Sequence, residues 1–199
     1  MALIGVLALQ GDFREHLSTL AAIGVDATAV KTKDEIESVD ALIIPGGEST
    51  VISKLAKTFG VFDVISKRIL NGLPVFGTCA GLIMLASEIL DAASEQSSFG
   101  GLDVSVRRNA FGHQVDSFET DLTFIGIEGS VHAVFIRAPV VEKVSPGVEI
   151  LSSLPDGRIV AVRQNNILGI SFHPEMTSEV RIHQYFADIV NRHLLKSQG

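Results

Sequence analysis

The sequence predicts an α/β fold in three layers, with a mostly parallel central sheet, helices on both faces and an antiparallel hairpin extension in the second half. Short apolar runs alternate with helix-like segments throughout the first half. The first run, residues 2–9, is apolar on both faces, as strands of buried parallel sheets are. Six short strand-like runs with little helix between them follow between residues 101 and 172, which is typical of antiparallel hairpins.

Periodicity and capping signals predict the elements of the first half. A helix is expected at residues 12–22, with an apolar face and Gly24 as its stop signal. Thr32-Lys33-Asp34-Glu35 has the pattern of a capping box, so a short helix is expected there. The other expected strands are residues 25–30, 41–44 and 74–76, and the other expected helices are residues 50–59 and 61–71.

The second half is predicted to be rich in strands and to end in a helix. The expected strands are residues 101–106, 117–122, 133–137, 148–152, 158–163 and 167–172. An apolar stripe at helical spacing then predicts a final helix at about residues 178–195. Because the chain shows neither a linker nor a repeat, we expect residues 1–199 to form a single domain.

Composition argues against several classes of function. A net charge of −7 disfavours nucleic acids and anionic membranes as partners. The single cysteine excludes an intrachain disulfide, and the opening segment lacks a basic leader, so a cytoplasmic location is expected. The uncharged stretch Ile69–Ser87 is interrupted by Pro74 and glycines, and we interpret it as a buried strand and helix instead of a membrane span.

The single cysteine, Cys79, lies in a pattern typical of a nucleophile. It follows the apolar run at residues 74–76 and precedes a second apolar run, so strand, sharp turn and helix succeed one another as in a nucleophile elbow. A side chain at Gly77 or Gly81 would crowd the neighbouring strand and helix. The helix N-terminus favours thiolate over thiol. The bland alternative is a buried, inert cysteine.

The best candidate for the base is His173. It ends a buried strand, and Pro174 favours an extended backbone before it. In an extended chain His173 and Glu175 share one face, so the carboxylate can orient the imidazole. Cys79, His173 and Glu175 therefore have the residue types of a catalytic triad. The alternative is a strand-end histidine beside a chance glutamate.

An acyl-transfer site also needs donors for an oxyanion. In any elbow the residue after the nucleophile, here Ala80, offers its backbone N–H. A second donor is expected from the glycine-rich loop Pro45–Thr50, where Gly47 can bring bare backbone close to a substrate. A plain turn remains possible there, whereas Glu48 disfavours phosphate binding. The other five histidines lack metal-ligand spacing, so we expect no metal and no cofactor.

Three motifs together resemble a known family. They are Gly77-Thr78-Cys79-Ala80-Gly81, His173-Pro174-Glu175 and Pro45-Gly46-Gly47-Glu48-Ser49. This combination is similar to the class I, or triad-type, glutamine amidotransferase domain. Further segments narrow the resemblance to the glutaminase subunits of pyridoxal 5′-phosphate synthases, over residues 4 to about 190. These segments are Leu9-Gln10-Gly11, Glu15-His16, Arg108-Asn109-Ala110-Phe111-Gly112, Gln114-Val115-Asp116-Ser117-Phe118-Glu119 and Phe135-Ile136-Arg137-Ala138-Pro139.

The resemblance implies specific roles for residues. Cys79 would attack the side-chain amide of L-glutamine, His173 would give a proton to the leaving ammonia, and water would release glutamate. The positions implied to bind glutamine are Gly47, Glu48, Ser49, Arg108, Ile136 and Arg137. The implied oxyanion donors are Gly47 and Ala80. An arginine fork suits the α-carboxylate of glutamine, and the choice between Arg108 and Arg137 stays open.

The resemblance also implies a partner. The family passes its ammonia to a ring-forming synthase subunit with a (β/α)8 barrel, in a large hetero-oligomer that makes the coenzyme from ribose 5-phosphate and glyceraldehyde 3-phosphate. Family members are weak glutaminases alone, and docking is thought to rearrange the Gly46-Gly47 peptide. His113 stands where the family pattern leads us to expect arginine, which puts one contact with the partner in doubt.

Other functions are compatible with part of the pattern. A cysteine-elbow protease, deglycase or redox sensor would also have a reactive thiol, without needing carboxylate-binding arginines. A glutaminase subunit of another amidotransferase would have the same triad. A regulatory partner with a vestigial triad would leave coenzyme formation dependent on ammonium salts.

Overall fold

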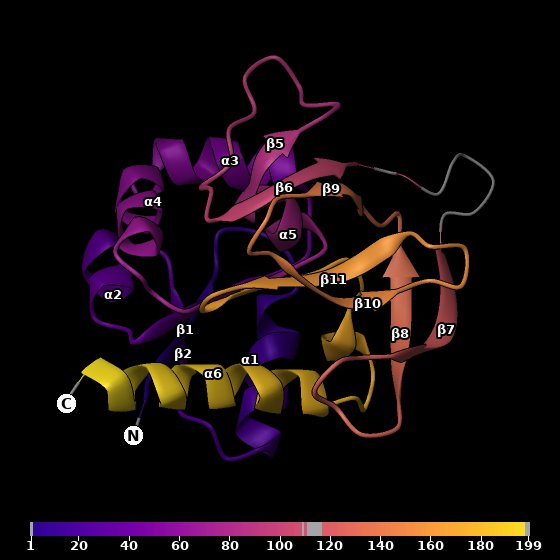
Figure 1. Ribbon diagram of the computed structural model, residues 1–199. Helices are drawn as coiled ribbons and strands as arrows, with labels where there is room; N and C mark the ends of the chain where they lie inside the picture. Colours follow the sequence, from indigo (N-terminus) through magenta and orange to yellow (C-terminus); the bar gives the residue numbers. More distant parts are fainter. Residues whose placement is uncertain (1, 109, 111–116, 198–199) are drawn as a thin grey trace.

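The computed structural model describes residues 2–108, 110 and 117–197. Among these residues, ten strands form one sheet: β1 (Ile4–Leu7), β2 (Ala27–Val30), β3 (Ala41–Ile44), β4 (Val75–Thr78), β5 (Ala86–Ile89), β6 (Leu102–Arg107), β9 (Val140–Val144), β10 (Glu149–Ser153), β11 (Ile159–Gln164) and β12 (Ile167–Ile170). Their order is β2-β1-β3-β4-β12-β11-β9-β6-β5, and β10 pairs with β11 (Figure 1). A separate hairpin joins β7 (Ser117–Thr123) and β8 (Ser130–Ile136).

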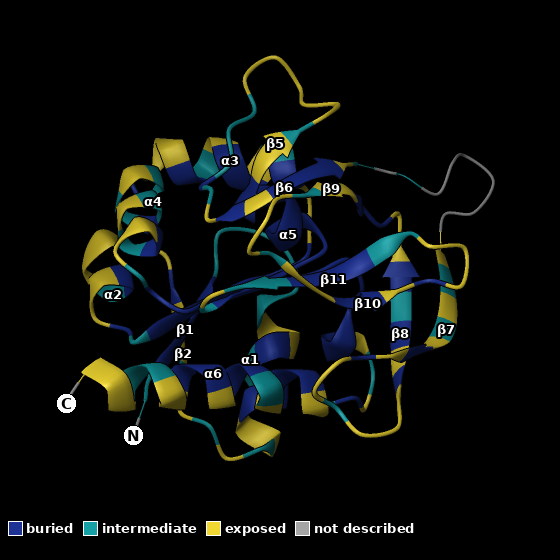
Figure 2. Cartoon of the chain, viewed as in Figure 1, coloured by how far each residue is buried: buried dark blue, intermediate teal, exposed yellow. Residues whose placement is uncertain are grey.

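Helices cover both faces of the sheet. They are α1 (Phe13–Ala22), α2 (Lys33–Glu37), α3 (Ser49–Thr58), α4 (Phe62–Leu70), α5 (Ala80–Leu85) and α6 (Arg181–Ser197), with a short 3-10 turn, η1 (Pro174–Met176). Helices α2 to α5 pack on one face through residues such as Ile36, Ile52 and Ile65. Helices α1 and α6 and the β7–β8 hairpin cover the other face, where Leu20 and Phe186 are buried. Figure 2 shows buried strands between helices whose outer turns are exposed.

The predicted three-layer α/β fold is confirmed. Strands β2, β1, β3, β4 and β12 pair in parallel, and β12 to β6 continue the sheet with antiparallel pairs. Strand β12, although it comes last along the chain, lies beside β4 in the middle of the sheet. The carboxyl ends of β4 and β12 therefore lie next to each other, and the N–H of Cys79 donates to the carbonyl of Ile170 at 2.8 Å.

Some elements differ from the sequence-based expectation. The helix after Cys79 ends at Leu85, because residues 86–89 form β5, which pairs in parallel with β6. Strand β9, which the sequence pattern missed, pairs with β6 and β11. In both segments pairing with a distant strand outweighs the local pattern. The β7–β8 hairpin packs on a face of the sheet instead of extending its edge.

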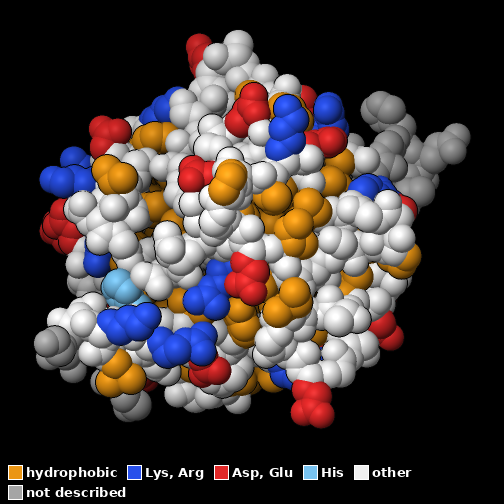
Figure 3. Space-filling view, viewed as in Figure 1, with side chains coloured by type: hydrophobic (Ala, Val, Ile, Leu, Met, Phe, Trp, Pro, Cys, Tyr) orange, Lys and Arg blue, Asp and Glu red, His pale blue; other side chains and the backbone are white. Residues whose placement is uncertain are grey.

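The long uncharged stretch at residues 69–87 is mostly buried within the fold, as the sequence predicts. Residues 69–87 fold into the end of α4, a turn, β4, α5 and the start of β5. Within the described ranges, every helix is too short or too polar to cross a membrane. Acidic and basic side chains are interspersed over the face drawn in Figure 3.

Candidate active site

Cys79 lies at the turn between β4 and α5 with a backbone that non-glycine residues rarely adopt. Its φ is 48° and its ψ is −103°, which is strained for an L-residue. A Cβ on Gly81 would lie 2.0 Å from the carbonyl oxygen of Ile44 on β3, and a Cβ on Gly77 would lie 2.5 Å from the carbonyl carbon of Gly81. Strand β4 and helix α5 therefore approach this closely only because both positions are glycine.

The imidazole of His173 is held by its neighbours in the chain. Its Nδ1 lies 2.7 Å from Oε1 of Glu175, and both residues are nearly fully buried. The backbone N–H of His173 donates to the carbonyl of Val134 on β8 at 2.9 Å. A Cβ on Gly46 would lie 2.4 Å from Cε1 of the ring, so the glycine leaves space for it. The segment after β12 thus fixes the orientation of the imidazole.

Charge at the site favours the protonated form of His173. Burial lowers the pKa of His173, but hydrogen bonds and charge interactions with Cys79 and Glu175 outweigh burial and raise this pKa to about 10. Burial raises the pKa of Glu175, and its hydrogen bond to His173 opposes that effect. The proton on His173 is therefore stabilised by both of its neighbours, Cys79 and Glu175.

The predicted site residues meet at one cavity of about 370 Å³. It is lined by Gln10, Asp12, Gly47, Glu48, Ser49, Cys79, Ile83, Arg108, Ile136, Arg137, His173 and Met176. All six positions implied to bind glutamine are in this lining. Glu175 lies behind His173, and Ala80 is the first residue of α5, directly after the cysteine.

Both candidate arginines face this cavity. The guanidinium of Arg108 donates to Oε1 of Gln96 at 2.8 Å and lies 3.5 Å from Oε1 of Glu48. Arg137 has a φ of 43°, a left-handed conformation, and follows Ile136, whose carbonyl oxygen lies 3.9 Å from Sγ of Cys79. Arg107 instead pairs with Glu142 at 2.7 Å, away from the cavity lining. His113 lies outside the described residues.

Four lining residues were not among the sequence-predicted site residues: Gln10, Asp12, Ile83 and Met176. The side chain of Gln10 accepts the N–H of Glu48 at 2.8 Å, and the N–H of Asp12 donates to the carbonyl of Gly46 at 3.2 Å. A signal for the first two was available, because they follow β1 at the sheet edge where the other strand ends carry site residues.

Donor atoms of Asp12, His173 and Glu175 all lie within 4.8 Å of one another, a spacing that could hold a metal ion. Two of these groups are already hydrogen-bonded to each other at 2.7 Å, and Oδ2 of Asp12 lies 3.7 Å from Nδ1 of His173. A metal would have to displace the bond that orients the imidazole. The absence of a metal stays a prediction.

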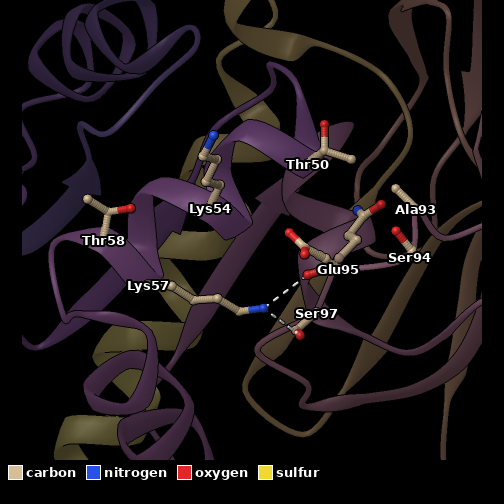
Figure 4. A pocket seen from close by; sticks show the side chains of 9 residues that line it. Thr50, Lys54, Lys57, Thr58, Ala93, Ser94, Glu95 and Ser97 are labelled. Atoms are coloured by element: carbon tan, nitrogen blue, oxygen red, sulfur yellow. Dashed lines mark hydrogen bonds between the residues drawn. The ribbon is translucent and has the colours of Figure 1, made fainter.

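A second cavity, of about 690 Å³, lies between α3 and the loop at residues 93–97 (Figure 4). Lys57 closes one side, donating to the carbonyl of Glu95 at 3.0 Å and to Oγ of Ser97 at 2.9 Å. Its described lining is made of lysines, hydroxyl groups and loop residues. Because the cysteine and the histidine both line the smaller cavity, that one is the candidate active site.

A cysteine in a nucleophile elbow beside a histidine–glutamate pair, at the carboxyl edge of a mostly parallel sheet, is the arrangement typical of cysteine-dependent enzymes of the triad type. The model of the SNO glutamine amidotransferase family matches residues 6–192, so the chain belongs to this family. Among its relatives, the "Pyridoxal 5'-phosphate synthase subunit PdxT" of Leifsonia xyli subsp. xyli is 58% identical over 185 residues, which cover 92% of this chain and 93% of the relative.

Other comparisons agree. The protein of the same description from Nocardia farcinica is 56% identical over 192 residues, covering 94% of this chain and 85% of the relative. A solved structure described as a glutamine amidotransferase has a TM-score of 0.89 and 51% identity, covering 94% of this chain and 98% of that one. A solved structure described as PurLQS from Thermotoga maritima shares the fold, with a TM-score of 0.66 at 17% identity, and both chains are covered at 100%.

Proposed function

We propose that this chain hydrolyses L-glutamine to glutamate and ammonia and is the glutaminase subunit of a pyridoxal 5′-phosphate synthase. The observation that carries this proposal is the convergence of Cys79, the His173–Glu175 pair and two arginines on one small cavity. A nucleophile beside its base performs acyl transfer, and an arginine recognises a carboxylate. The relatives named above bear the name of this synthase's subunit.

The reaction proceeds through a thioester. The thiolate of Cys79 adds to the side-chain amide carbon of glutamine, and the backbone N–H groups of Gly47 and Ala80 stabilise the oxyanion. The imidazolium of His173 gives its proton to the amide nitrogen, and ammonia leaves. His173 then takes a proton from water, hydroxide adds to the thioester carbon, and glutamate leaves as the thiolate re-forms.

Glu175 keeps the imidazole in one orientation through the bond between Oε1 and Nδ1. Its negative charge stabilises the imidazolium that each half of the reaction needs. The glutamine is bound by residues from two segments of the cavity lining: Gly47, Glu48, Ser49 and Ile136. Its α-carboxylate is bound by Arg108 or Arg137. The guanidinium of an arginine can donate two parallel hydrogen bonds to such a carboxylate.

The ammonia passes to the synthase subunit of the same enzyme. The partner is a (β/α)8 barrel in a large hetero-oligomer, and it forms the coenzyme from ribose 5-phosphate and glyceraldehyde 3-phosphate. The names of the relatives support a synthase partner, and the resemblance described above supplies its fold and substrates. A cytoplasmic location is part of the same proposal.

The test is to measure glutamate release from glutamine by the full chain, alone and mixed with the barrel synthase subunit. We expect slow release alone and faster release in the mixture, with coenzyme formed from glutamine. Cleavage of peptides or repair of glycated substrates without glutamine turnover would favour the protease or deglycase alternatives. Coenzyme formation from ammonium salts but not from glutamine would favour a regulatory partner with a vestigial triad.

A further inference from the structure

Two fully buried histidines lie directly behind the triad. His16 on α1 and His183 on α6 are both 0% exposed, and Nδ1 of His16 lies 2.8 Å from Nε2 of His183. Both rings meet Phe76 of β4 edge-on, at centroid distances of 6.1 and 5.7 Å. The pair lies in the layer of α1 and α6, and the cavity lining described above does not include it.

The second nitrogen of His16 faces the triad carboxylate. Its Nε2 lies 3.2 Å from Oγ1 of Thr78, at the end of β4, and 3.7 Å from Oε2 of Glu175. The other oxygen of Glu175 accepts the bond from His173, whereas Oε2 is buried with no hydrogen-bond partner among the described residues. A buried carboxylate oxygen requires positive charge or a donor nearby, and the imidazole of His16 is placed to supply it.

Electrostatics fixes the positions of the protons. If Nε2 of His16 were unprotonated, its lone pair would face the Glu175 carboxylate in a dry site and be repelled by it. With the proton on Nε2, His16 donates toward Thr78 and the carboxylate, and its Nδ1 accepts the N–H of His183 Nε2. The hydrogen-bond network therefore favours the Nε2–H tautomer for both His16 and His183.

We propose that His16, locked in this tautomer by His183, is a positioning residue that holds the Glu175 carboxylate ionised and aimed at His173. The chain of contacts then runs from His183 through His16 and Glu175 to His173 and Cys79. This inference rests on the proposed role of the triad and extends it into α1 and α6.

A neutral donor suits this place. Burial lowers the pKa of His16 well below 6.5, helped by repulsion from His183 when that ring is protonated and from the protonated His173, and burial lowers the pKa of His183 to about 4. Both imidazoles are therefore uncharged near neutral pH, so they orient Glu175 without neutralising the charge that the His173 imidazolium needs.

The groups that face Glu175 come from several elements. His173 lies on its own segment, and Asp12 and His16 approach from the start of α1. On the side of β8, the carbonyl of Val134 accepts the N–H of His173. Asp12 adds negative charge near the carboxyl group and raises the pKa of Glu175 further, whereas the hydrogen bond and charge of His173 lower it.

The test is the pH dependence of Cys79 alkylation by iodoacetamide in the full chain, for wild type, His16→Leu and His16→Gln. In His16→Leu the Glu175 carboxylate loses the polar N–H that faces its Oε2, so we expect the acid limb of the rate to move up by roughly 0.5–1 pH unit. His16→Gln keeps an N–H near the same place and should restore the wild-type limb. His193→Leu, which removes a histidine bonded to Asn166 instead, is the matched control and should leave the limb unchanged.

The outcomes separate this inference from the proposed function. An unshifted acid limb in a folded His16→Leu protein, or a limb in His16→Gln as displaced as in His16→Leu, overturns the inference. Where His16→Leu does not fold, His183→Leu takes its place, and an unshifted limb there overturns it likewise. Glutamate release by the wild type is measured in parallel, because its absence would overturn the proposed function while the alkylation result still stands.

Discussion

At the scale of single residues, we expect the reactivity of Cys79 to depend on the protonated imidazole of His173. Hydrogen bonding and charge from Cys79 and Glu175 overcome the effect of burial and raise the pKa of the imidazole to about 10. The imidazolium of His173 therefore persists through neutral pH. The strained backbone at Cys79 holds the sulfur at this place, since glycines at positions 77 and 81 let strand and helix meet around it.

The pair predicts an unusual alkylation profile for the free subunit. The rate of iodoacetamide reaction with Cys79 should already be near its plateau at pH 7. In His173→Asn the rate should instead climb near the ordinary thiol pKa of about 8.5 and be roughly tenfold or more lower at pH 7. Mass spectrometry of the modified chain at timed intervals measures both. Superimposable profiles would mean that the imidazole does not activate the sulfur.

At the scale of elements, the loop after β5 contacts residues that we propose to bind glutamine. The side chain of Gln96 accepts from Arg108 at 2.8 Å and donates to Oγ of Ser49 at 2.9 Å. Lys57 on α3 ties the same loop through Glu95 and Ser97. The side-chain amide of Gln96 therefore bridges Ser49 and Arg108, two residues that we assign to glutamine binding.

Replacing Gln96 with alanine should weaken glutamine binding without changing the chemistry. Losing the bond to a charged guanidinium should raise the KM for glutamine about tenfold and leave kcat within about twofold. Steady-state glutamate release in the presence of the synthase subunit measures this. Ser94→Ala, an exposed change on the same loop, is the control. A fall in kcat at constant KM would show that the loop acts on catalysis instead.

The α1–α6 layer predicts how the fold responds to acid. The pKa of His183 is lowered to about 4 by burial, so between pH 6.5 and 4 the unfolded chain binds a proton that the folded chain does not. The contribution of His183 to the free energy of unfolding is therefore fully present above pH 6.5. It is lost as the pH falls through this window, by about 3 kcal/mol in all. Urea titrations at several pH values measure the free energy of unfolding. Its dependence on pH between 6.5 and 4 should be weaker in His183→Leu than in the wild type, and an equal dependence would refute the prediction.

Most of the fold could be predicted because its signals are local. The run before Cys79, its flanking glycines and Pro174 after His173 each constrain a few neighbouring residues. Strands β5 and β9 could not be predicted in this way, since they exist through pairing with β6. The same holds for His16, which reaches the triad only because α1 packs beside η1 and α6.

At the scale of the whole molecule, the site is a consequence of sheet order. Strands β1, β3, β4 and β12 are parallel neighbours, so their carboxyl ends bring together Gln10, Gly47, Cys79 and His173. These residues come from segments far apart in the sequence. Open α/β sheets bind ligands at this edge, and the parallel centre therefore places nucleophile, base and glycine-rich loop around one cavity.

The central claim is that glutamine is hydrolysed at the sulfur of Cys79. The most direct measurement is glutamate release by the complex of this chain with the synthase subunit, compared between wild type and Cys79→Ala. We predict that the variant folds, binds its partner and supports coenzyme formation from ammonium salts, but releases no glutamate above background. Glutamate release by Cys79→Ala at the wild-type rate would contradict the account.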